Sequence, residues 1–397
     1  MSRKAPRPGR RRLRVAIVAP SLAILGGQGV QAHILIEHLR ADGFQVDLLP
    51  INPVFPPALS GLRQVPYLRT VLNEAIYIPR LSAVRRADVV HVFSASYWSF
   101  LLAPVPALIA ARLAGRPVVL HYHSGEADDH LTHWGPLVHP WLRLVDEIVV
   151  PSVYLQEVFA KHGYPSRVIR NALDVSAFPY RERIALQPRL LSVRNLEQMY
   201  GVDQTLRAFA YVKAKWPHAT LTIAGYGSEE RRLRDLAATL RLDGVRFVGR
   251  VEPAKLPRLY DEADIFLNSS TIDNQPVSIL EALACGLPIV STPIGDIPAM
   301  LRHGHAGILV PPGDPEAMAA AVDTLLTHPG RVRAVTRAGI DEVERYNWMN
   351  VRDDWTTLYH AMATSAARLA VAAPVPVANA AACTTPRNPG MESTDRG

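Results

Sequence analysis

Charged residues in the second half of the chain stand where predicted strands end. Arg194 ends one apolar run, and Asp273 lies in the loop after another. Ser278 and Glu281 form a Ser-x-x-Glu capping box that predicts a helix directly after this loop. The amino end of a helix carries partial positive charge and free N–H groups, and a guanidinium binds two phosphate oxygens at once. The pattern therefore predicts a binding site for an anionic, phosphorylated ligand.

The elements that must position these residues are apolar runs that alternate with helical patterns. The predicted strands are 14–20, 45–51, 88–95, 117–123, 147–152, 166–172, 189–194, 219–225, 244–250, 264–270, 288–293 and 307–312. Runs rich in Val, Ile and Leu that are separated by helices are typical of buried parallel strands. The sequence predicts an α/β fold of two Rossmann-like, doubly wound parallel sheets, with the ligand in the cleft between them.

Composition places the domain boundaries. We predict a basic disordered arm over 1–12, a first domain over 13–178, a second domain over 179–345, a helix crossing back to the first domain over 346–364, and a disordered Ala/Pro-rich tail over 365–397. The length of 397 residues and the 48% of hydrophobic residues suit two domains.

The stretch that begins at Asp273 resembles the family 4 retaining glycosyltransferases of the GT-B fold. Their signature is two glutamates separated by seven residues, followed by Ala-x-Ala-x-Gly-x-Pro-x-Val. Here Asp273 replaces the first glutamate, Glu281 is the second, and residues 282–290 read Ala-Leu-Ala-Cys-Gly-Leu-Pro-Ile-Val. The likeness covers residues 13–363.

The resemblance implies an enzyme that moves a sugar from a nucleotide sugar to a glycan or lipid-linked acceptor, in cell-surface polysaccharide or glycoconjugate synthesis. The second domain would bind the donor and the first the acceptor. The first acid of the signature lies by the donor sugar, and the second holds the ribose. Relatives lack an evident protein nucleophile and need no metal. The implied catalytic residues are His123, Asp273 and Arg194. The implied donor-binding residues are Gly26, Gly27, Gly29, Gly225, Gly227, Val248, Arg250, Asn274, Gln275, Pro276, Val277, Ser278, Ile279 and Glu281.

One position departs from the family pattern. Relatives carry a lysine six residues after the arginine, whereas this chain has Tyr200 there. A tyrosine donates one hydrogen bond but brings no positive charge. With Asp273, this replacement motivates the alternative of a catalytically weakened nucleotide-sugar-binding protein. A sugar epimerase or hydrolase of the same fold is a further alternative.

A glycine loop follows the first predicted strand. Residues 27–32 match Gly-x-Gly-x-x-Ala, so a nicotinamide-dependent oxidoreductase is a competing hypothesis. The segment 20–25 intervenes between this strand and the glycines, and no acid ends the second strand. Both features are atypical of a dinucleotide site. The family resemblance places the loop under the donor diphosphate.

Histidines and acids gather between 121 and 133. Their spacing matches no metal motif, so solvated loop residues are expected and a metal site is the alternative. By resemblance, His123 is the active-site histidine. We expect His121 on the opposite face of its strand, packed in the core.

The remaining features concern location and partners. Seven arginines and lysines among the first 14 residues account for the formal net charge of +7, so no nucleic-acid partner is expected, with anionic lipid or RNA as the alternative. Two cysteines suit a reducing, cytoplasmic setting. Residues 89–111 are predicted as a buried strand plus helix and not a membrane span. Residues 55–85 predict an amphipathic helix or a peripheral contact with the inner face of the plasma membrane. We expect no cofactor besides the nucleotide-sugar co-substrate.

Overall fold

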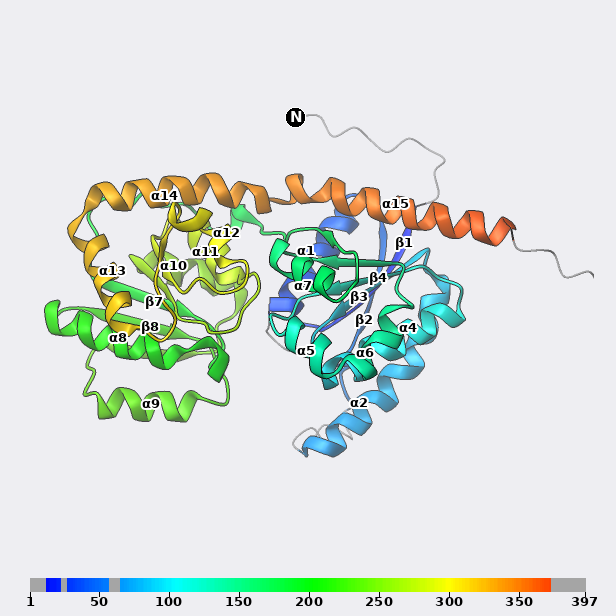
Figure 1. Ribbon diagram of the computed structural model, residues 1–397, viewed down its shortest axis with the longest axis horizontal. Coiled ribbons are helices and arrows are strands. Elements are labelled where there is room, and N and C mark those ends of the chain that lie inside the picture. Colours follow the sequence, from blue (N-terminus) through cyan, green and yellow to red (C-terminus); the bar gives the residue numbers. More distant parts are fainter. Residues whose placement is uncertain (1–11, 23–26, 57–64, 373–397) are drawn as a thin grey trace, which may run out of the picture.

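The computed structural model describes residues 12–22, 27–56 and 65–372. Within them the chain forms two six-stranded parallel sheets, ordered β2-β1-β3-β4-β5-β6 and β12-β11-β10-β7-β8-β9. The predicted pair of doubly wound domains is therefore confirmed (Figure 1).

Each of the twelve predicted runs contains one strand. The strands are β1 (Arg14–Ala19), β2 (Gln45–Pro50), β3 (Val89–Ser94), β4 (Val118–Tyr122), β5 (Glu147–Val150), β6 (Arg167–Val168), β7 (Arg189–Val193), β8 (Thr220–Ala224), β9 (Val245–Gly249), β10 (Ile265–Asn268), β11 (Ile289–Ser291) and β12 (Ile308–Leu309). β3, β4 and β10 are buried along their whole length, as expected for strands covered by helices on both faces. β6 and β12 are much shorter than predicted, because only two residues of each pair with a neighbouring strand.

Helices cover both faces of each sheet. They are α1 (Gly27–Ala41), α2 (Pro66–Arg80), α3 (Trp98–Leu102), α4 (Pro104–Leu113), α5 (Ala127–His133), α6 (Gly135–Leu142), α7 (Val153–Lys161), α8 (Val202–Lys215), α9 (Glu230–Thr239), α10 (Leu256–Glu262), α11 (Val277–Ala284), α12 (Ile297–Met300), α13 (Pro315–Thr327), α14 (Pro329–Val343) and α15 (Trp348–Ala372). The segment 89–111 is thus a strand followed by two short helices. No helix in the described part of the chain has the length and apolar character that crossing a bilayer requires.

The long helix α15 connects the end of the second domain to the first (Figure 1). Trp348, Trp355 and Tyr359 pack with residues of α1, β1, β3 and β4 in one buried cluster. The Tyr359 hydroxyl lies 2.7 Å from Nδ1 of His91 in β3. The predicted start of the disordered tail is wrong, because residues 365–372 continue this helix. The rest of the tail, and the arm up to residue 11, lie outside the described residues.

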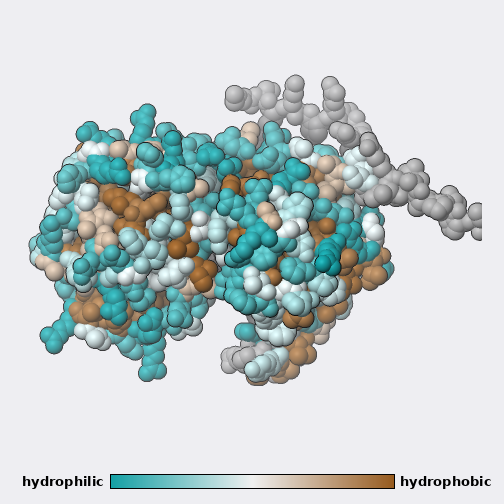
Figure 2. Space-filling model, viewed as in Figure 1, coloured by the Kyte–Doolittle hydropathy of each residue, from teal (hydrophilic) through white to brown (hydrophobic). Residues whose placement is uncertain are grey.

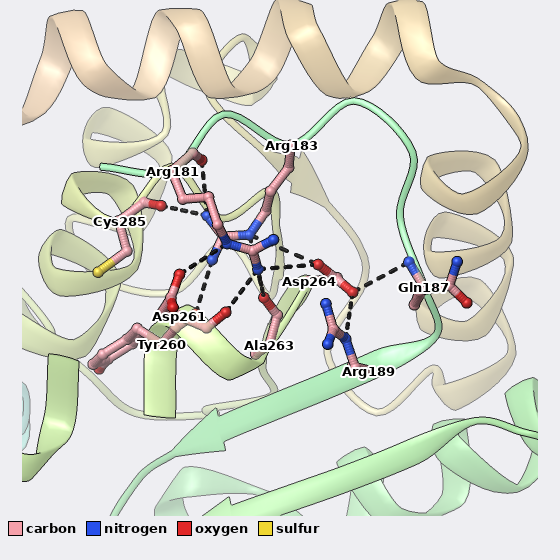
Figure 3. A network of polar contacts seen from close by, with 9 residues as sticks. All are labelled: Arg181, Arg183, Gln187, Arg189, Tyr260, Asp261, Ala263, Asp264 and Cys285. Atoms are coloured by element: carbon pink, nitrogen blue, oxygen red, sulfur yellow. Dashed lines mark hydrogen bonds and ion pairs between the residues drawn. The ribbon is translucent and has the colours of Figure 1, made fainter. Parts of the chain in front are cut away.

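Asp264, immediately before β10, fixes the segment that joins the domains (Figure 3). Its side chain is only 3% exposed, and it accepts hydrogen bonds from Arg189 Nε at 2.7 Å and Arg181 Nη2 at 3.3 Å. The backbone N–H of Gln187 donates to it as well, at 3.2 Å. The Asp264 carboxylate therefore binds two residues of the connecting segment, Arg181 and Gln187, and the first residue of β7, Arg189.

Arg183 enters the same network from the connecting segment (Figure 3). Its guanidinium is 1% exposed and donates to the carbonyl groups of Tyr260 at 2.9 Å, Ala263 at 3.2 Å and Cys285. Burial lowers the pKa of Arg183 to about 10. Tyr260 lies in the last turn of α10 and Cys285 directly follows α11, so the network ties the connecting segment to both helices.

Candidate functional site

A cavity of about 420 Å³ lies between the domains, at the carboxyl ends of the strands. This is where open parallel sheets bind ligands. Residues from α1, the ends of β4 and β7, and the start of α11 line it. Its volume suits a ligand of moderate size.

Arg194 lies at the end of β7 and is nearly buried. Its guanidinium donates a hydrogen bond to the Asp273 carboxylate, and both side chains are about one-tenth exposed. The ring of Tyr200 lies beneath the guanidinium, with Cζ 4.2 Å from the ring centroid. A second, long hydrogen bond of 3.4 Å reaches Ser278 Oγ. Tyr200 therefore packs against the arginine as a cation–π partner.

Glu281 lies in the second turn of α11, so the predicted capping box is wrong. The helix begins at Val277 with Pro276 as its N-cap residue, and no side chain caps it. The Glu281 carboxylate instead accepts a 2.6 Å hydrogen bond from the hydroxyl of Tyr260. Burial raises the pKa of Glu281 to about 7, and the bond from Tyr260 acts in the opposite direction.

His123 follows β4 and lines the cavity, stacked on Phe93 with ring centroids 5.1 Å apart. Burial lowers its pKa to about 3, so the imidazole is neutral at physiological pH. Its Nε2 has no hydrogen-bond partner among the described residues. A neutral ring with an unpartnered nitrogen is suited to bind a hydroxyl group.

The prediction that His121 faces away from His123 is wrong. Residues two apart on a strand share a face, and the two ring centroids lie 4.0 Å apart. His121 is buried as predicted, and neither of its ring nitrogens has a hydrogen-bond partner among the described residues. It packs behind His123, against Trp355 of α15.

The loop after Asp273 reaches across to the first domain. Asn274 accepts a 2.5 Å hydrogen bond from Ser152 Oγ and donates to the His123 carbonyl at 3.3 Å. A Cβ on Gly125 would lie 2.6 Å from the Asp273 carbonyl carbon, so only a glycine permits this approach. The two domains therefore touch beside the cavity.

Gln275 extends this contact. It accepts from the Asn171 backbone N–H at 3.1 Å, and it donates to the Pro151 carbonyl at 2.8 Å and to Asp296 at 2.9 Å. Both of its side-chain polar atoms are thus engaged. Its role in donor binding stays a prediction.

The cavity brings together most of the residues that the sequence singled out. They are Gly27, His123, Arg194, Gly225, Arg250, Asp273, Asn274, Gln275, Pro276, Val277, Ser278 and Glu281. Gly29, Gly227, Val248 and Ile279 are not among the lining residues, and Gly26 lies outside the described residues.

Gly225 has a structural requirement for glycine. Its φ of 147° is rare for other residues, and a Cβ there would lie 1.8 Å from the Arg194 carbonyl oxygen. The turn after β8 therefore packs directly against the backbone that carries Arg194.

Sequence reasoning missed several residues of the site. Gln28, Glu126 and Tyr226 line the cavity, and Tyr260 supports Glu281 from α10. Glu126 belongs to the acid cluster after β4, so its place at a strand end was a usable signal. Nothing local to Tyr260 reveals its contact with a residue 21 positions away.

The histidines and acids after β4 do not form a metal site in the part of the chain that the structure describes. No three His, Cys, Asp or Glu side chains there are arranged to hold a metal ion. Asp128 instead pairs with Lys161 at 2.8 Å and lies 2.9 Å from His162, and Asp129 lies 2.9 Å from Nδ1 of His133.

Two family models match the chain, one on each domain. Residues 25–177 match "Glycosyltransferase Family 4", and residues 187–328 match "Glycosyl transferases group 1". A glycogen synthase of Mycobacterium tuberculosis is 30% identical over 85% of this chain and 91% of its own. A phosphatidyl-myo-inositol mannosyltransferase of Mycobacterium leprae is 28% identical over 91% of this chain and all of its own.

Solved structures agree on the fold. A sucrose-phosphate synthase from Thermosynechococcus elongatus superimposes with a TM-score of 0.72 at 19% identity, over 89% of this chain and all of its own. The Anabaena protein HepE, solved with UDP and glucose, gives 0.69 at 18% identity, over 88% of this chain and all of its own. The relatives favour an active transferase over a binding protein or an oxidoreductase. The chain belongs to the family 4, group 1 glycosyltransferases of the GT-B fold.

Proposed function

We propose that the second domain binds a nucleotide sugar and that the sugar passes, with retention, to a glycan or lipid-linked acceptor held by the first domain. The observation that carries this proposal is the convergence of Arg194, Asp273 and Glu281 from three elements on one interdomain cavity. No other described cavity combines a buried guanidinium with two carboxyl groups.

The residues take different roles in this proposal. Arg194 and the amino end of α11 stabilise the negative charge that builds on the departing diphosphate. Glu281 accepts hydrogen bonds from the ribose hydroxyls, and Asp273 with the neutral His123 orients the donor sugar. A phosphate oxygen of the donor takes the acceptor proton. The nucleotide sugar is a co-substrate, and the proposal includes no separate cofactor.

Tyr200 has a defined place in this mechanism. Its ring holds the plane of the Arg194 guanidinium, where relatives have a second cation. Arg250, near the ring of Tyr226, also lines the cavity. We propose that these two arginines, and not an arginine–lysine pair, bind the diphosphate.

Calorimetric titration of UDP, GDP and ADP, each with and without an attached sugar, tests the donor assignment. Saturable micromolar binding of one base is expected. If none of these nucleotides binds to folded protein, the proposed donor site is wrong.

Replacing Glu281 by alanine is expected to weaken nucleoside diphosphate binding by about 1–3 kcal/mol, because the ribose hydroxyls lose a charged partner. Calorimetry of the variant measures this change. Equal affinity in wild type and folded Glu281→Ala would exclude Glu281 from the site.

The same carboxyl group predicts a pH dependence. Its folded pKa of about 7 lies above its ordinary value of 4.5, so the folded protein binds a proton that the unfolded chain lacks between these pH values. The contribution of Glu281 to stability therefore falls as pH rises from about 4.5 to 7. Nucleotide binding, which uses the ionised form, strengthens over the upper part of this range. Tyr260→Phe removes the hydrogen bond that favours ionisation of Glu281. The midpoint of the pH dependence of nucleotide binding should therefore move to higher pH in this variant.

We further propose that α2 rests on an anionic membrane surface at the inner face of the plasma membrane. Tyr67, Val71 and Ile78 are exposed on this helix, which projects from the first domain in Figure 1. Figure 2 shows hydrophobic residues along the same projection. Residues 66–86 include four arginines and a single acid, half-buried Glu74. Exposed apolar side chains among arginines complement anionic headgroups.

Vesicle flotation tests this contact. Wild type should float with vesicles that contain phosphatidylglycerol and much less with pure phosphatidylcholine. The double variant Tyr67→Ser/Val71→Ser should lose most of this binding. Met349→Ser is the matched control, because Met349 and Val71 are equally exposed at 65%. Equal flotation of the double variant and the control would contradict the proposal.

A further inference from the structure

A second cavity of about 390 Å³ opens beside the donor cavity. The two share Gly125, Glu126, Ile272 and Asp273 as lining residues. Asp273 is the residue proposed to lie beside the donor sugar, and it also lines the second cavity. The second cavity is therefore next to the place of the transferred sugar. A molecule bound there is adjacent to the reacting group.

Glu126 stands at the junction of the two cavities. Its side chain is half-buried and has no hydrogen bond or ion pair within the described part of the chain. Burial raises the pKa of Glu126, and the charge of Asp129 adds to this effect. A partly desolvated carboxyl group without a protein partner is available to a ligand hydroxyl.

Two tyrosines form part of the wall. The Tyr97 hydroxyl donates a 2.6 Å hydrogen bond to Asp129, and its ring lies edge-on to Trp134 at 5.6 Å. Tyr97 also has a φ of 56° and a ψ of −133°, a conformation that costs a non-glycine residue about 1–3 kcal/mol. Tyr154 lines the cavity from α7. Aromatic rings offer apolar faces to the C–H groups of a sugar and a polar edge to its hydroxyls.

The charge of this cavity differs from that of the donor cavity. Glu126, Asp129 and Asp273 line it, whereas no Arg, Lys or His does so among the described residues. The donor cavity contains two arginines and His123 in addition to its carboxyl groups. Asp273 already pairs with Arg194, and Asp129 pairs with His133 and Tyr97, so Glu126 is the carboxyl group of this lining without a partner among the described residues. Such a carboxylate repels an anionic group and accepts hydrogen bonds from hydroxyls.

We propose that the second cavity binds an uncharged sugar residue of the acceptor, with Glu126 accepting a hydrogen bond from one of its hydroxyls. This inference rests on the proposed function, and it assigns the acceptor to neutral glycans. Acceptors with a carboxylate or phosphate on the bound residue bind more weakly, because Glu126 repels the second negative charge.

Neutral and charged methyl glycosides test the assignment. The probes are methyl α-glucoside, α-galactoside and α-mannoside, each paired with its uronate, added to protein saturated with the nucleoside diphosphate that it binds. Saturation-transfer NMR measures glycoside binding, and nucleoside diphosphate release from the sugar donor measures transfer. At least one neutral glycoside should bind and accelerate release, at least tenfold more effectively than its uronate.

Glu126→Gln should raise the KM for that glycoside about tenfold, as for loss of a charged hydrogen-bond acceptor. The KM values of the glycoside and its uronate should also differ less in this variant than in wild type. Because Glu126 also lines the donor cavity, the KM for the donor is measured in parallel, and it should change less than the KM for the glycoside. Glu157→Gln is the matched control, since Glu157 is exposed on α7 and lines neither cavity.

Two outcomes overturn the inference. One is preference for a uronate, or no binding of any neutral glycoside, by protein that still binds nucleotide. The other is an unchanged acceptor KM in Glu126→Gln. Failure of the proposed function differs from both, because nucleotide binding itself would then be absent from wild type.

Discussion

Replacing Arg194 by alanine is expected to lower kcat for glycosyl transfer by about 10²–10³-fold, the usual effect of losing one preorganised group that stabilises developing charge. The guanidinium is nearly buried, and Tyr200 and Asp273 hold it from two sides. Its removal also leaves the Asp273 carboxylate beside the diphosphate without its cation. Steady-state release of nucleoside diphosphate from the sugar donor measures the effect.

Two further variants separate these causes. The double variant Arg194→Ala/Asp273→Asn also removes the negative charge of Asp273. Any activity that it has above Arg194→Ala therefore measures the repulsion between Asp273 and the diphosphate, and not the loss of the cation. Tyr200→Phe keeps the ring beneath the guanidinium and should stay within about twofold of wild type, because the cation–π contact does not use the hydroxyl. An Arg194→Ala enzyme within tenfold of wild-type kcat would remove Arg194 from the catalytic residues.

Replacing Asp264 by alanine is expected to lower the free energy of unfolding by about 3–5 kcal/mol, the cost of removing one partner from a buried ion pair. Arg183 is 1% exposed and would keep its charge with only carbonyl groups as partners. The N–H of Gln187 and the guanidinium of Arg189 would lose their acceptor as well. Urea denaturation followed by tryptophan fluorescence measures the loss.

Asp261→Ala is the matched control for this prediction. Asp261 pairs with Arg181 at 2.9 Å but is 56% exposed, so its removal should cost less than about 1 kcal/mol. Comparable losses from Asp261→Ala and Asp264→Ala would show that burial does not set the strength of this network.

The fold could be predicted because burial on both faces leaves a strong pattern in the sequence. β3 and β4 read as mostly apolar runs with one histidine each, and such runs separated by helices are typical of a doubly wound sheet. The short strands β6 and β12 were overestimated because their length depends on pairing with neighbours, which a single apolar run does not encode.

The sequence predicted where most residues of the site lie, but it did not predict which residues they contact. Arg194, Asp273 and His123 follow strand ends, and parallel strands bring such ends to one edge of a sheet. The capping box failed because α11 begins at Val277, with Pro276 and not Ser278 as its N-cap residue, and Glu281 binds Tyr260 instead. The contact of Ser152 with Asn274 joins residues 122 positions apart, and only the tertiary fold creates it.

The contact of Asn274 and Gln275 with the first domain limits the exchange of whole domains between this enzyme and its relatives. Asn274 and Gln275 are hydrogen-bonded to Ser152, Pro151 and Asn171, so the loop belongs to the second domain in sequence but also contacts the first domain in space. A chimera that takes its second domain from a relative with another donor sugar would separate this loop from its partners. Exchange of donor specificity by recombination therefore requires matched residues at the ends of β5 and β6.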